Sequence, residues 1–448
     1  MKPGPNSDGN SSSSSGWDTN YEWKCVCLLT LGFGLVGLDR WVIADLAAAK
    51  SSTMVADLHL GSPALVGNLV AILGVAWGVS SMFMGSLSDR YGRKMVLVPA
   101  LIAFSLLSGF SGVASSFAAM LLMRATMGAA EGAYCPTSFA TVAEASKPSR
   151  RGFNMGLQQS TFALFGLGFG PIIATQMLQY MSWRWVFAIV GIPGLIIAAL
   201  VAMTIREPLT IRARRGAYRT PDLELAPAKF QLKALFSHRN IPLSMVTLLC
   251  AMCGIFVLSA FTPVYLTTYL KLSDQQMGGV VSAIGFGGFL GQWWLSGLSD
   301  RFGRRTMALA GFTVGALFLV FFMNAGRDNL LLLFCLLFVS AAFAFGLLSL
   351  ITGPISAEAA PIGMIASSSG IIIGVGEIFG GGVAPSIAGT IASSYGVQYT
   401  LYLALGGLVV GAVVSLFYRE TAPSKVGKGD GESPLDKLED RVGEVTAA

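Results

Sequence analysis

Residues 85–94 read GSLSDRYGRK, and nearly the same loop, SGLSDRFGRR, occurs again at residues 296–305, a shift of 211 positions. Three shorter landmarks recur at shifts of 213 or 214 positions: Ala143-Glu144-Ala145 corresponds to Ala357-Glu358-Ala359, Gly170-Pro171 to Ala384-Pro385, and Arg206-Glu207 to Arg419-Glu420. A nearly constant shift across four landmarks indicates a duplicated structural unit. We therefore expect two similar halves, with residues 207–241 as the linker between them.

The composition is that of a chain that lies in lipid. Hydrophobic residues make up 53% of the 448 positions and charged residues 12%, so the chain is far more apolar than an ordinary soluble domain. Apolar runs of roughly 20 residues, enough for a helix to cross about 30 Å of hydrocarbon, recur with short breaks. Because lipid cannot hydrogen-bond the backbone, these runs should be helices. The predicted spans lie near residues 23–48, 63–84, 95–115, 117–142, 153–177, 184–204, 242–270, 276–297, 306–325, 329–352, 362–390 and 397–418.

These spans predict an all-α membrane protein of twelve transmembrane helices, arranged as two parallel six-helix bundles at residues 23–206 and 242–418. An even number of spans in each unit keeps the two copies parallel, so that a cavity can form between them. It also puts both ends of the chain on one side of the membrane. Residues 1–22, rich in Ser, Gly and Asn, are predicted to be a disordered tail, and residues 419–448 form a second tail.

The distribution of basic residues predicts the orientation in the membrane. The formal net charge is +6, but the basic residues gather in loops, such as Arg90, Arg93 and Lys94. The loops of the opposite side hold only Lys50, Arg184, Lys271 and Arg327. Because basic residues are retained on the cytoplasmic face, we expect both tails and the linker to be cytoplasmic, with the protein in the inner (cytoplasmic) cell membrane. The charge therefore indicates topology and contact with the lipid bilayer, and it does not indicate nucleic acid as a partner.

Cysteines and histidines offer no site for chemistry. The six cysteines fall in or at the ends of apolar runs, and the only two histidines, His59 and His238, fall in loops. Such spacing fits neither a disulfide framework nor a metal site. The sequence also lacks a motif for an activated nucleophile. We therefore expect no metal, no cofactor and no enzymatic activity.

The repeated loop resembles the sequence between helices 2 and 3 of the major facilitator superfamily, and its second copy stands where that family has one. The resemblance covers the chain from about Trp23 to Glu420 and implies the family's two-bundle fold. In the family, the Asp of this loop pairs with a basic side chain and with a helix terminus of the other half, which closes the cytoplasmic side. The resemblance therefore implies a gate made of six loop residues: Asp89, Arg90, Arg93, Asp300, Arg301 and Arg304.

Five ionisable residues lie well inside the predicted spans, where charges are costly and are candidates for function: Asp39, Arg40, Arg124, Glu131 and Glu377. Arg124 and Glu131 are seven positions apart, which is two helical turns, so they share one face roughly 10 Å apart along the axis. Asp39 and Arg40 are adjacent and point about 100° apart around their helix. Two acids and two arginines cancel within the first half, which predicts that they pair with one another when the site is empty.

Leu38-Asp39-Arg40, together with Arg124-x-x-x-Gly128-x-x-Glu131-Gly132-x-x-x-Pro136, resembles the anion:cation symporter branch of the superfamily. Members of that branch carry sugar acids, aromatic carboxylates, sialic acid and vesicular glutamate, many of them together with protons. The likeness implies that Arg40 and Arg124 bind the substrate carboxylate and that Asp39 and Glu131 take up and release protons. A guanidinium suits this role because it keeps its charge and its planar fork fits a carboxylate. Here Trp41-Val-Ile follows the Asp-Arg pair, where many family members carry a polar stretch.

The remaining candidates are one acid and several amides and tyrosines. Glu377 lies in a glycine-rich segment that ends at Pro385, and it is either a further proton site or a polar clamp between helices. Further substrate contacts are expected from side chains at membrane depth: Gln158, Gln159, Tyr265, Tyr269 and Gln292. Tyr269 could equally anchor the chain at a membrane interface, as could Trp293 and Trp294. Since mid-membrane arginines occur only in the first half, a monocarboxylate with an apolar or aromatic body is favoured over a sugar acid.

Together these features predict proton-coupled uptake of a small organic anion by a monomeric secondary transporter. One alternative is a proton-coupled exporter of drugs or metabolites, because Gly166-Leu-Gly-Phe-Gly170-Pro171 resembles part of a motif of such antiporters. Another is a lipid carrier like the spinster proteins, which show a similar pattern of charges. A third is a membrane sensor that binds ligand without transporting it, and the short tails and linker argue against it.

Overall fold

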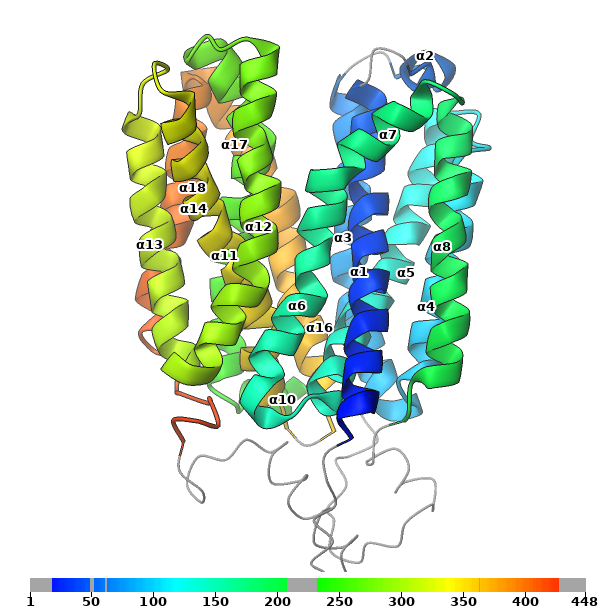
Figure 1. The fold of residues 1–448 in the computed structure, drawn as a ribbon, viewed down its shortest axis with the longest axis vertical. Coiled ribbons are helices and arrows are strands. Elements are labelled where there is room, and N and C mark those ends of the chain that lie inside the picture. The colour runs from blue at the N-terminus through cyan, green and yellow to red at the C-terminus, as the bar shows by residue number, and fades with distance from the viewer. Residues whose placement is uncertain (1–17, 49–51, 61–62, 208–231, 362, 427–448) are drawn as a thin grey trace, which may run out of the picture.

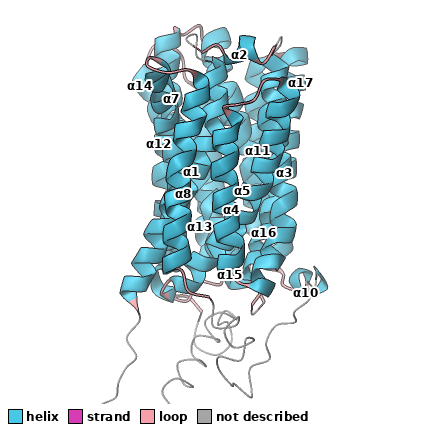
Figure 2. Cartoon of the chain, turned by 90° about the vertical axis from the view of Figure 1, so that its right-hand side faces the viewer, coloured by secondary structure: helices cyan, strands magenta, loops and turns pink. Residues whose placement is uncertain are grey.

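The computed structural model describes residues 18–48, 52–60, 63–207, 232–361 and 363–426. These residues are helical almost throughout and include no strand, as Figure 2 shows. The first half consists of α1 (Thr19–Ala48), α2 (Met54–Asp57), α3 (Pro63–Tyr91), α4 (Lys94–Ser111), α5 (Phe117–Ala145), η1 (Pro148–Arg150), α6 (Arg151–Ala163), η2 (Leu164–Phe169), α7 (Gly170–Leu178) and α8 (Trp183–Thr204). The second half consists of α10 (Leu232–Phe236), α11 (Asn240–Val264), η3 (Tyr265–Tyr269), α12 (Asp274–Phe302), α13 (Arg304–Asn324), α14 (Leu330–Leu350), η4 (Ile351–Ile355), α15 (Ser356–Ala359), α16 (Ile365–Val375), η5 (Gly376–Val383), α17 (Ala384–Tyr395), η6 (Val397–Tyr399) and α18 (Thr400–Ser415).

The helices form two bundles that stand side by side with their axes along the longest direction of the molecule (Figure 1). α2 lies at one end and α10 at the other, and we call these the α2 end and the α10 end. α1 begins at the α10 end, and the segment after α18 returns to it. The two halves therefore run parallel, as the repeat predicts.

The helices are long and apolar enough for a membrane. Within the described ranges, nine helical runs pass a test of length and hydropathy for crossing a bilayer, and the bent run from η1 to α7 makes ten. α5 and α12 complete the twelve: each has 29 residues but is more polar, and α5 carries Arg124 and Glu131. The twelve-helix architecture predicted from the sequence is confirmed.

The predicted tails are partly structured. α1 begins at Thr19, four residues before the predicted span, because the Asp18 carboxylate accepts the backbone N–H of Tyr21 and Glu22 is fully buried. The boundary at residue 22 is therefore wrong, and residues 1–17 lie outside the described part of the chain. Residues 419–426 of the second predicted tail pack against the loops of the second half. The remainder of that tail and residues 208–231 of the linker also lie outside the described residues.

Four spans change from α-helical to π-helical hydrogen bonding part-way along their length. Two of these segments, η2 and η5, occupy equivalent positions in the two halves, and each is followed by a proline at the second residue of the next helix. Proline has no backbone N–H and cannot continue the regular ladder, so the ladder is interrupted one turn before it. Glu377 lies in η5, which places it in a locally irregular helix.

Glycines bring the two halves into close contact towards the α10 end. A Cβ atom on Gly85 of α3 would lie 2.1 Å from the carbonyl oxygen of Ala366 in α16. A Cβ atom on Gly156 of α6 would lie 2.4 Å from the carbonyl oxygen of Gln292 in α12. Only glycine permits backbones to approach this closely, so α3 packs on α16 and α6 on α12 across the boundary between the halves.

Candidate functional site

The first copy of the repeated loop forms a compact ion network. The Arg93 guanidinium donates to the Asp89 carboxylate at 2.8 Å and to the Glu144 carboxylate at 2.6 Å. Glu207 accepts the backbone N–H groups of Arg93 and Lys94 at the start of α4. Arg93 is only 2% exposed, and a buried guanidinium needs such partners to offset its lost hydration.

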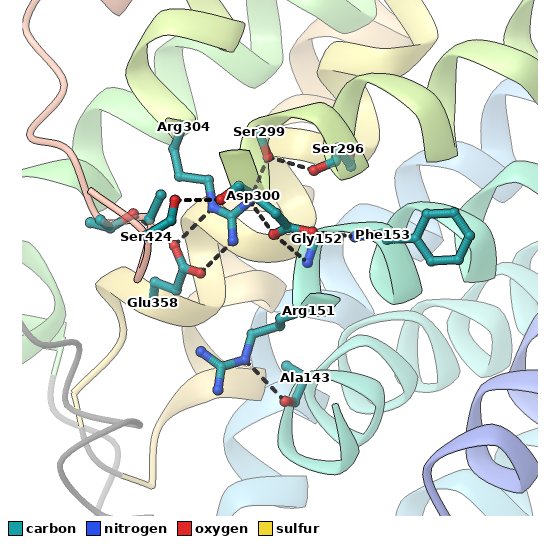
Figure 3. A network of polar contacts seen from close by, with 12 residues as sticks. Ala143, Arg151, Gly152, Phe153, Ser296, Ser299, Asp300, Arg304, Glu358 and Ser424 are labelled. Atoms are coloured by element: carbon teal, nitrogen blue, oxygen red, sulfur yellow. Dashed lines mark hydrogen bonds and ion pairs between the residues drawn. The ribbon is translucent and has the colours of Figure 1, made fainter. Parts of the chain in front are cut away.

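The second copy repeats this arrangement almost group for group (Figure 3). The Arg304 guanidinium donates to the Asp300 and Glu358 carboxylates, each at 2.7 Å. Glu420 accepts the backbone N–H groups of Arg304 and Arg305 at the start of α13, as Glu207 does in the first half. The repeated sequence thus folds into a repeated structure.

Each loop aspartate also reaches the first turn of a helix in the other half. Asp89 accepts the backbone N–H groups of Ala366 and Ser367 at the start of α16, and the hydroxyl of Ser367. Asp300 accepts the backbone N–H groups of Gly152 and Phe153 at the start of α6, both at 3.0 Å (Figure 3). The N-terminus of a helix has free N–H donors and a positive dipole, so it stabilises a carboxylate there. These two contacts hold the halves together at the α10 end.

Two of the six predicted gate residues stand apart from these networks. Arg90 is exposed, and its guanidinium lies over the ring of the neighbouring Tyr91, 5.1 Å from the ring centre. Arg301 is also exposed and makes no hydrogen bond or ion pair to another residue of the described chain. Each follows a buried aspartate directly, and adjacent helix positions point about 100° apart, so these arginines face outward. Their role in the gate therefore stays a prediction, which no contact among the described residues supports.

At the centre of the molecule, an ion pair joins the two halves. Nη1 and Nη2 of Arg40 in α1 donate to Oε1 and Oε2 of Glu377 in η5 at 3.0 and 2.8 Å. The side chains are 3% and 5% exposed. The Arg40 guanidinium also lies 4.8 Å from the ring centre of Trp77 and 5.1 Å from that of Phe256. A cation is stabilised over an aromatic face, so this is a two-pronged ion pair in an aromatic surrounding.

Arg124 contacts the backbone of α1 rather than a carboxylate. Its Nη1 and Nη2 donate to the carbonyl oxygens of Asp39 and Arg40 at 3.0 and 2.9 Å. The Asp39 carboxylate instead accepts the hydroxyl of Ser108 at 2.8 Å. The predicted pairing of the charges within the first half is therefore wrong for the described residues, because Arg40 finds its carboxylate in the other half and Arg124 finds backbone acceptors.

Glu131 is fully buried, and neither of its carboxylate oxygens has a hydrogen-bond partner within the described ranges. The charges of Asp39, Arg40, Arg124 and Glu377 all act on it. A buried carboxylate without a hydrogen bond is costly if it is ionised. Glu131 therefore differs from the acids at the α10 end, all of which have close donors.

A small cavity of about 40 Å³ lies beside the central ion pair and is lined by both halves. Nearly half of the residues in its walls are aromatic, among them Trp41, Trp77, Phe162, Phe256 and Phe345. Gln159 and Thr352 add polar groups from opposite halves, and they hydrogen-bond each other at 2.9 Å. Sites for small organic ligands usually measure about 300–1,000 Å³. The central site is therefore contracted in this conformation.

The chain matches the Major Facilitator Superfamily over residues 29–372, with an overlapping second match over residues 264–442. The chain belongs to the Major Facilitator Superfamily.

The chain is also similar to two curated relatives and to one solved structure. The chain is 27% identical, over 432 residues, to a "Probable 4-methylmuconolactone transporter" of Cupriavidus pinatubonensis, covering 93% of this chain and 94% of the relative. It is 25% identical, over 304 residues, to the 4-hydroxybenzoate transporter PcaK of Pseudomonas putida, covering 60% of this chain and 66% of the relative. The solved structure of the proton:xylose symporter XylE bound to 6-bromo-6-deoxy-D-glucose shares the fold, with a TM-score of 0.74, 17% identity, and coverage of 94% of this chain and 100% of that one.

Of the five amide and tyrosine side chains predicted to contact substrate, Gln159 alone is among the residues that line the central cavity of the described structure. Its neighbour in the chain, Gln158, donates to the hydroxyl of Ser138 in α5. Gln292 is fully buried in α12, and no described residue hydrogen-bonds its amide. Tyr265 and Tyr269 stack on each other near Phe322 of α13, and they are not among the residues lining the cavity. Their contact with substrate stays a prediction.

Sequence reasoning did not single out the aromatic wall around Arg40. Trp77 and Phe162 of the first half and Phe256 of the second all lie within 6 Å of its guanidinium. Aromatic residues are common in the spans of any transporter of this superfamily, so their type alone gives no signal. The useful signal is the buried arginine, because such a cation draws aromatic faces and carboxylates to itself.

Proposed function

We propose that this protein is a proton-coupled transporter that takes up a small organic anion, an aromatic or other monocarboxylate, by alternating access. The observation that carries the proposal is Arg40, a buried guanidinium at the boundary between the halves with aromatic faces on several sides. Its charge selects an anion, and its surroundings suit a planar apolar body. Two relatives are named as transporters of 4-hydroxybenzoate and 4-methylmuconolactone, and this supports the proposed class of substrate.

Arg40 is the residue that binds the substrate carboxylate in this proposal. Arg124 was expected to share that task, but both of its Nη atoms donate to the backbone of α1 at Asp39 and Arg40. A guanidinium in that position fixes the stretch of helix that carries Arg40. We therefore assign to Arg124 the positioning of Arg40 in the contracted state.

Glu131 and Asp39 are the proposed proton carriers. Glu131 is the stronger candidate, because it is fully buried and has no hydrogen-bond donor among the described residues. Such a group can exist at low cost only when a proton neutralises it or a cation approaches it. Asp39 has the Ser108 hydroxyl as a donor, and one of its carboxylate oxygens has no partner in the described part of the protein.

The α10 end is proposed to be the cytoplasmic side, on the basis of the many basic residues in its loops. Asp89 and Asp300 then form the cytoplasmic gate, since each binds the first turn of a helix in the opposite half. Breaking these two contacts lets the halves separate at that end. Alternation between a closed and an open α10 end exposes the central site to each side of the membrane in turn.

The proposal can be tested with purified protein in proteoliposomes that carry an imposed pH gradient. We expect 4-hydroxybenzoate or benzoate to accumulate on the alkaline side. Glu131→Gln should abolish this accumulation but keep exchange of labelled for unlabelled substrate, because exchange needs no net proton movement. Asp328→Asn, which removes an exposed acid of the α13–α14 loop, is the matched control and should behave like the natural protein.

Three results would contradict this proposal. If Glu131→Gln still accumulates substrate along a pH gradient, Glu131 does not carry the coupled proton. If a pH gradient drives substrate towards the acidic side, the protein is an exporter that exchanges substrate for protons. Absence of transport for every carboxylate tested would reject the substrate class.

A further inference from the structure

We propose that Glu377 is a built-in stand-in for the substrate: in the empty protein its carboxylate occupies the place on Arg40 that the substrate carboxylate takes during transport. This inference rests on the proposed function, and it gives Glu377 a role beyond that of a simple clamp, because its carboxylate competes with the substrate for Arg40. Binding of substrate is then an exchange of one carboxylate for another on the same guanidinium.

The geometry of the ion pair is the first support. Each Nη atom of Arg40 donates to a different carboxylate oxygen of Glu377. This is the two-pronged arrangement in which a guanidinium binds any free carboxylate. Arg40 Nε is buried and has no partner among the described residues. Glu377 therefore fills the end-on fork of Arg40, and a substrate carboxylate can use that fork only after Glu377 has left it.

The space around the pair is the second support. The cavity of about 40 Å³ beside Glu377 is too small for an aromatic acid, and Glu377 is itself one of its walls. Glycines from α3 and η5 surround the carboxylate: a Cβ on Gly381 would lie 2.9 Å from Glu377 Oε2, and a Cβ on Gly74 would lie 3.7 Å from it. Without side chains at these positions, the carboxylate has room to turn away from Arg40. Its departure enlarges the cavity where the substrate ring would lie.

The connectivity of the pair is the third support. Arg40 belongs to the first half and Glu377 to the second, 337 positions further along the chain. A substrate carboxylate on Arg40 removes this link at the centre of the molecule. The contacts of Asp89 and Asp300 at the α10 end are left intact by that exchange. Substrate binding therefore releases the halves at the centre before the gate opens.

The exchange has a consequence for charge. Once displaced, Glu377 is a buried carboxylate that has lost its cation, so it takes one proton from hydronium in the entering water and becomes a neutral acid. The net charge of the site then does not change. The proton on Glu377 is taken up in addition to the one that Glu131 is proposed to carry. Besides Arg40 from α1, the ionisable groups that act on this pair are Arg124, Glu131 and Cys135 from α5, while α11 contributes Met252 and Phe256 to the cavity wall.

The test compares Glu377→Gln with the natural protein in detergent, with benzoate as the probe and neutral benzamide as its control. Glu377→Gln removes the competing negative charge, so we expect benzoate to bind about tenfold more tightly or better, with benzamide unchanged. We also expect Glu377→Gln to take up one proton fewer per benzoate bound than the natural protein, measured with a pH indicator in weak buffer.

Glu131→Gln serves as the matched control. It removes another buried acid close to Arg40 but does not vacate the position on the guanidinium. If it tightens benzoate binding as much as Glu377→Gln does, the effect is general electrostatics and the inference is wrong. Unchanged or weaker binding by a folded Glu377→Gln protein, or a proton uptake equal to that of the natural protein, also overturns it. If the natural protein binds no carboxylate at all, the proposed function fails instead.

Discussion

The buried charges at the α10 end and those at the centre of the molecule are treated differently by the fold. At the α10 end, Arg93 and Arg304 each contact two carboxylates, and the loop aspartates bind helix N-termini. At the centre, Arg40 has one carboxylate and Glu131 has no hydrogen-bond donor within the described residues. Fully paired networks favour one conformation, whereas incompletely paired charges can accept a ligand or a proton.

Symmetry differs between the two regions in the same way. The networks at the α10 end occur twice, because a gate between two halves needs a matching contact from each. The central charges occur once, with four of the five in the first half. The comparison indicates that the duplicated parts of the chain serve the movement of the halves, and that the unique parts serve recognition of the substrate.

The largest effect is expected from Arg40. Among the described residues, Arg40 is the central arginine whose guanidinium forms an ion pair with a carboxylate. We therefore expect Arg40→Ala to lower carboxylate uptake by at least about 100-fold, from the loss of a charge-assisted contact worth roughly 3 kcal/mol. Arg40→Lys should be nearly as poor, since an ammonium cannot bind two oxygens in the same fork. Initial uptake rates normalised to protein in the membrane measure this. Arg327→Ala, at an exposed loop position, is the control and should be unaffected.

One result for Arg40→Ala would contradict the role given to the central charges. If Arg40→Ala still transports a carboxylate at a normal rate, substrate recognition lies elsewhere. Gln159 and Thr352, which already bridge the halves across the cavity, are then the next candidates.

A smaller effect is expected from the two aspartates at the α10 end, and Asp89 should contribute more than Asp300 to keeping that end closed. Asp89 receives a hydroxyl from Ser367 in addition to two backbone N–H groups, whereas the equivalent position beside Asp300 is Phe153, which offers only its N–H group. A hydrogen bond to a charged group contributes about 1.5–3 kcal/mol, so Asp89→Asn should open the α10 end roughly tenfold or more. Asp300→Asn should open it less. The rate at which a maleimide added at the α10 end labels Met155→Cys, a buried position of α6 between the halves, reports opening.

The native cysteines provide the background for that measurement, because Cys27 and Cys335 are exposed. Labelling is therefore compared with and without Met155→Cys. Equal labelling for Asp89→Asn, Asp300→Asn and the natural aspartates would mean that these contacts do not hold the α10 end closed, and the comparison with the centre would lose its basis.

Most of the architecture could be predicted from the sequence, because it depends on local properties. Apolar runs define the spans, and the repeated loops define the halves. The start of α1 was misplaced because an acid such as Glu22 near the end of an apolar run is usually exposed. In the structure Glu22 is buried, because Arg150 of η1 and Asn154 of α6 donate hydrogen bonds to its carboxylate. Arg90 and Arg301 were included in the gate because the motif contains them, but the helix turns their side chains outward.

The central site could be predicted only as a set of residues. Arg40, Arg124, Glu131 and Glu377 are conspicuous as charges in apolar runs, yet their partners depend on how the halves pack. No local pattern indicates that Arg40 binds an acid 337 positions away, or that Arg124 uses backbone carbonyl oxygens. The aromatic wall is equally a product of packing. Long-range pairing in a chain of this length is therefore what the structure adds.

The smallest effect is expected at the α2 end, where an exposed acid sets the lower limit of the comparison. Asp57, 36% exposed, accepts hydrogen bonds from Trp183 Nε1 at 2.8 Å and from the Thr53 hydroxyl at 3.0 Å. These bonds lower the pKa of the Asp57 carboxyl from its ordinary value of about 3.9.

The lowered pKa of Asp57 means that the folded protein binds this proton less readily than the unfolded chain. The contribution of Asp57 to stability is therefore present above about pH 4 and is lost as the pH falls through the pKa of the folded state. We expect the melting temperature of the natural protein to fall slightly more between pH 5 and pH 3 than that of Asp57→Asn, with less effect at high salt because the group is exposed. The melting temperature of Asp89→Asn is measured over the same pH range. If Asp57→Asn changes the melting temperature as much as Asp89→Asn does, the exposure of a charge does not decide how much it contributes, and the contrast between buried and exposed pairs is wrong.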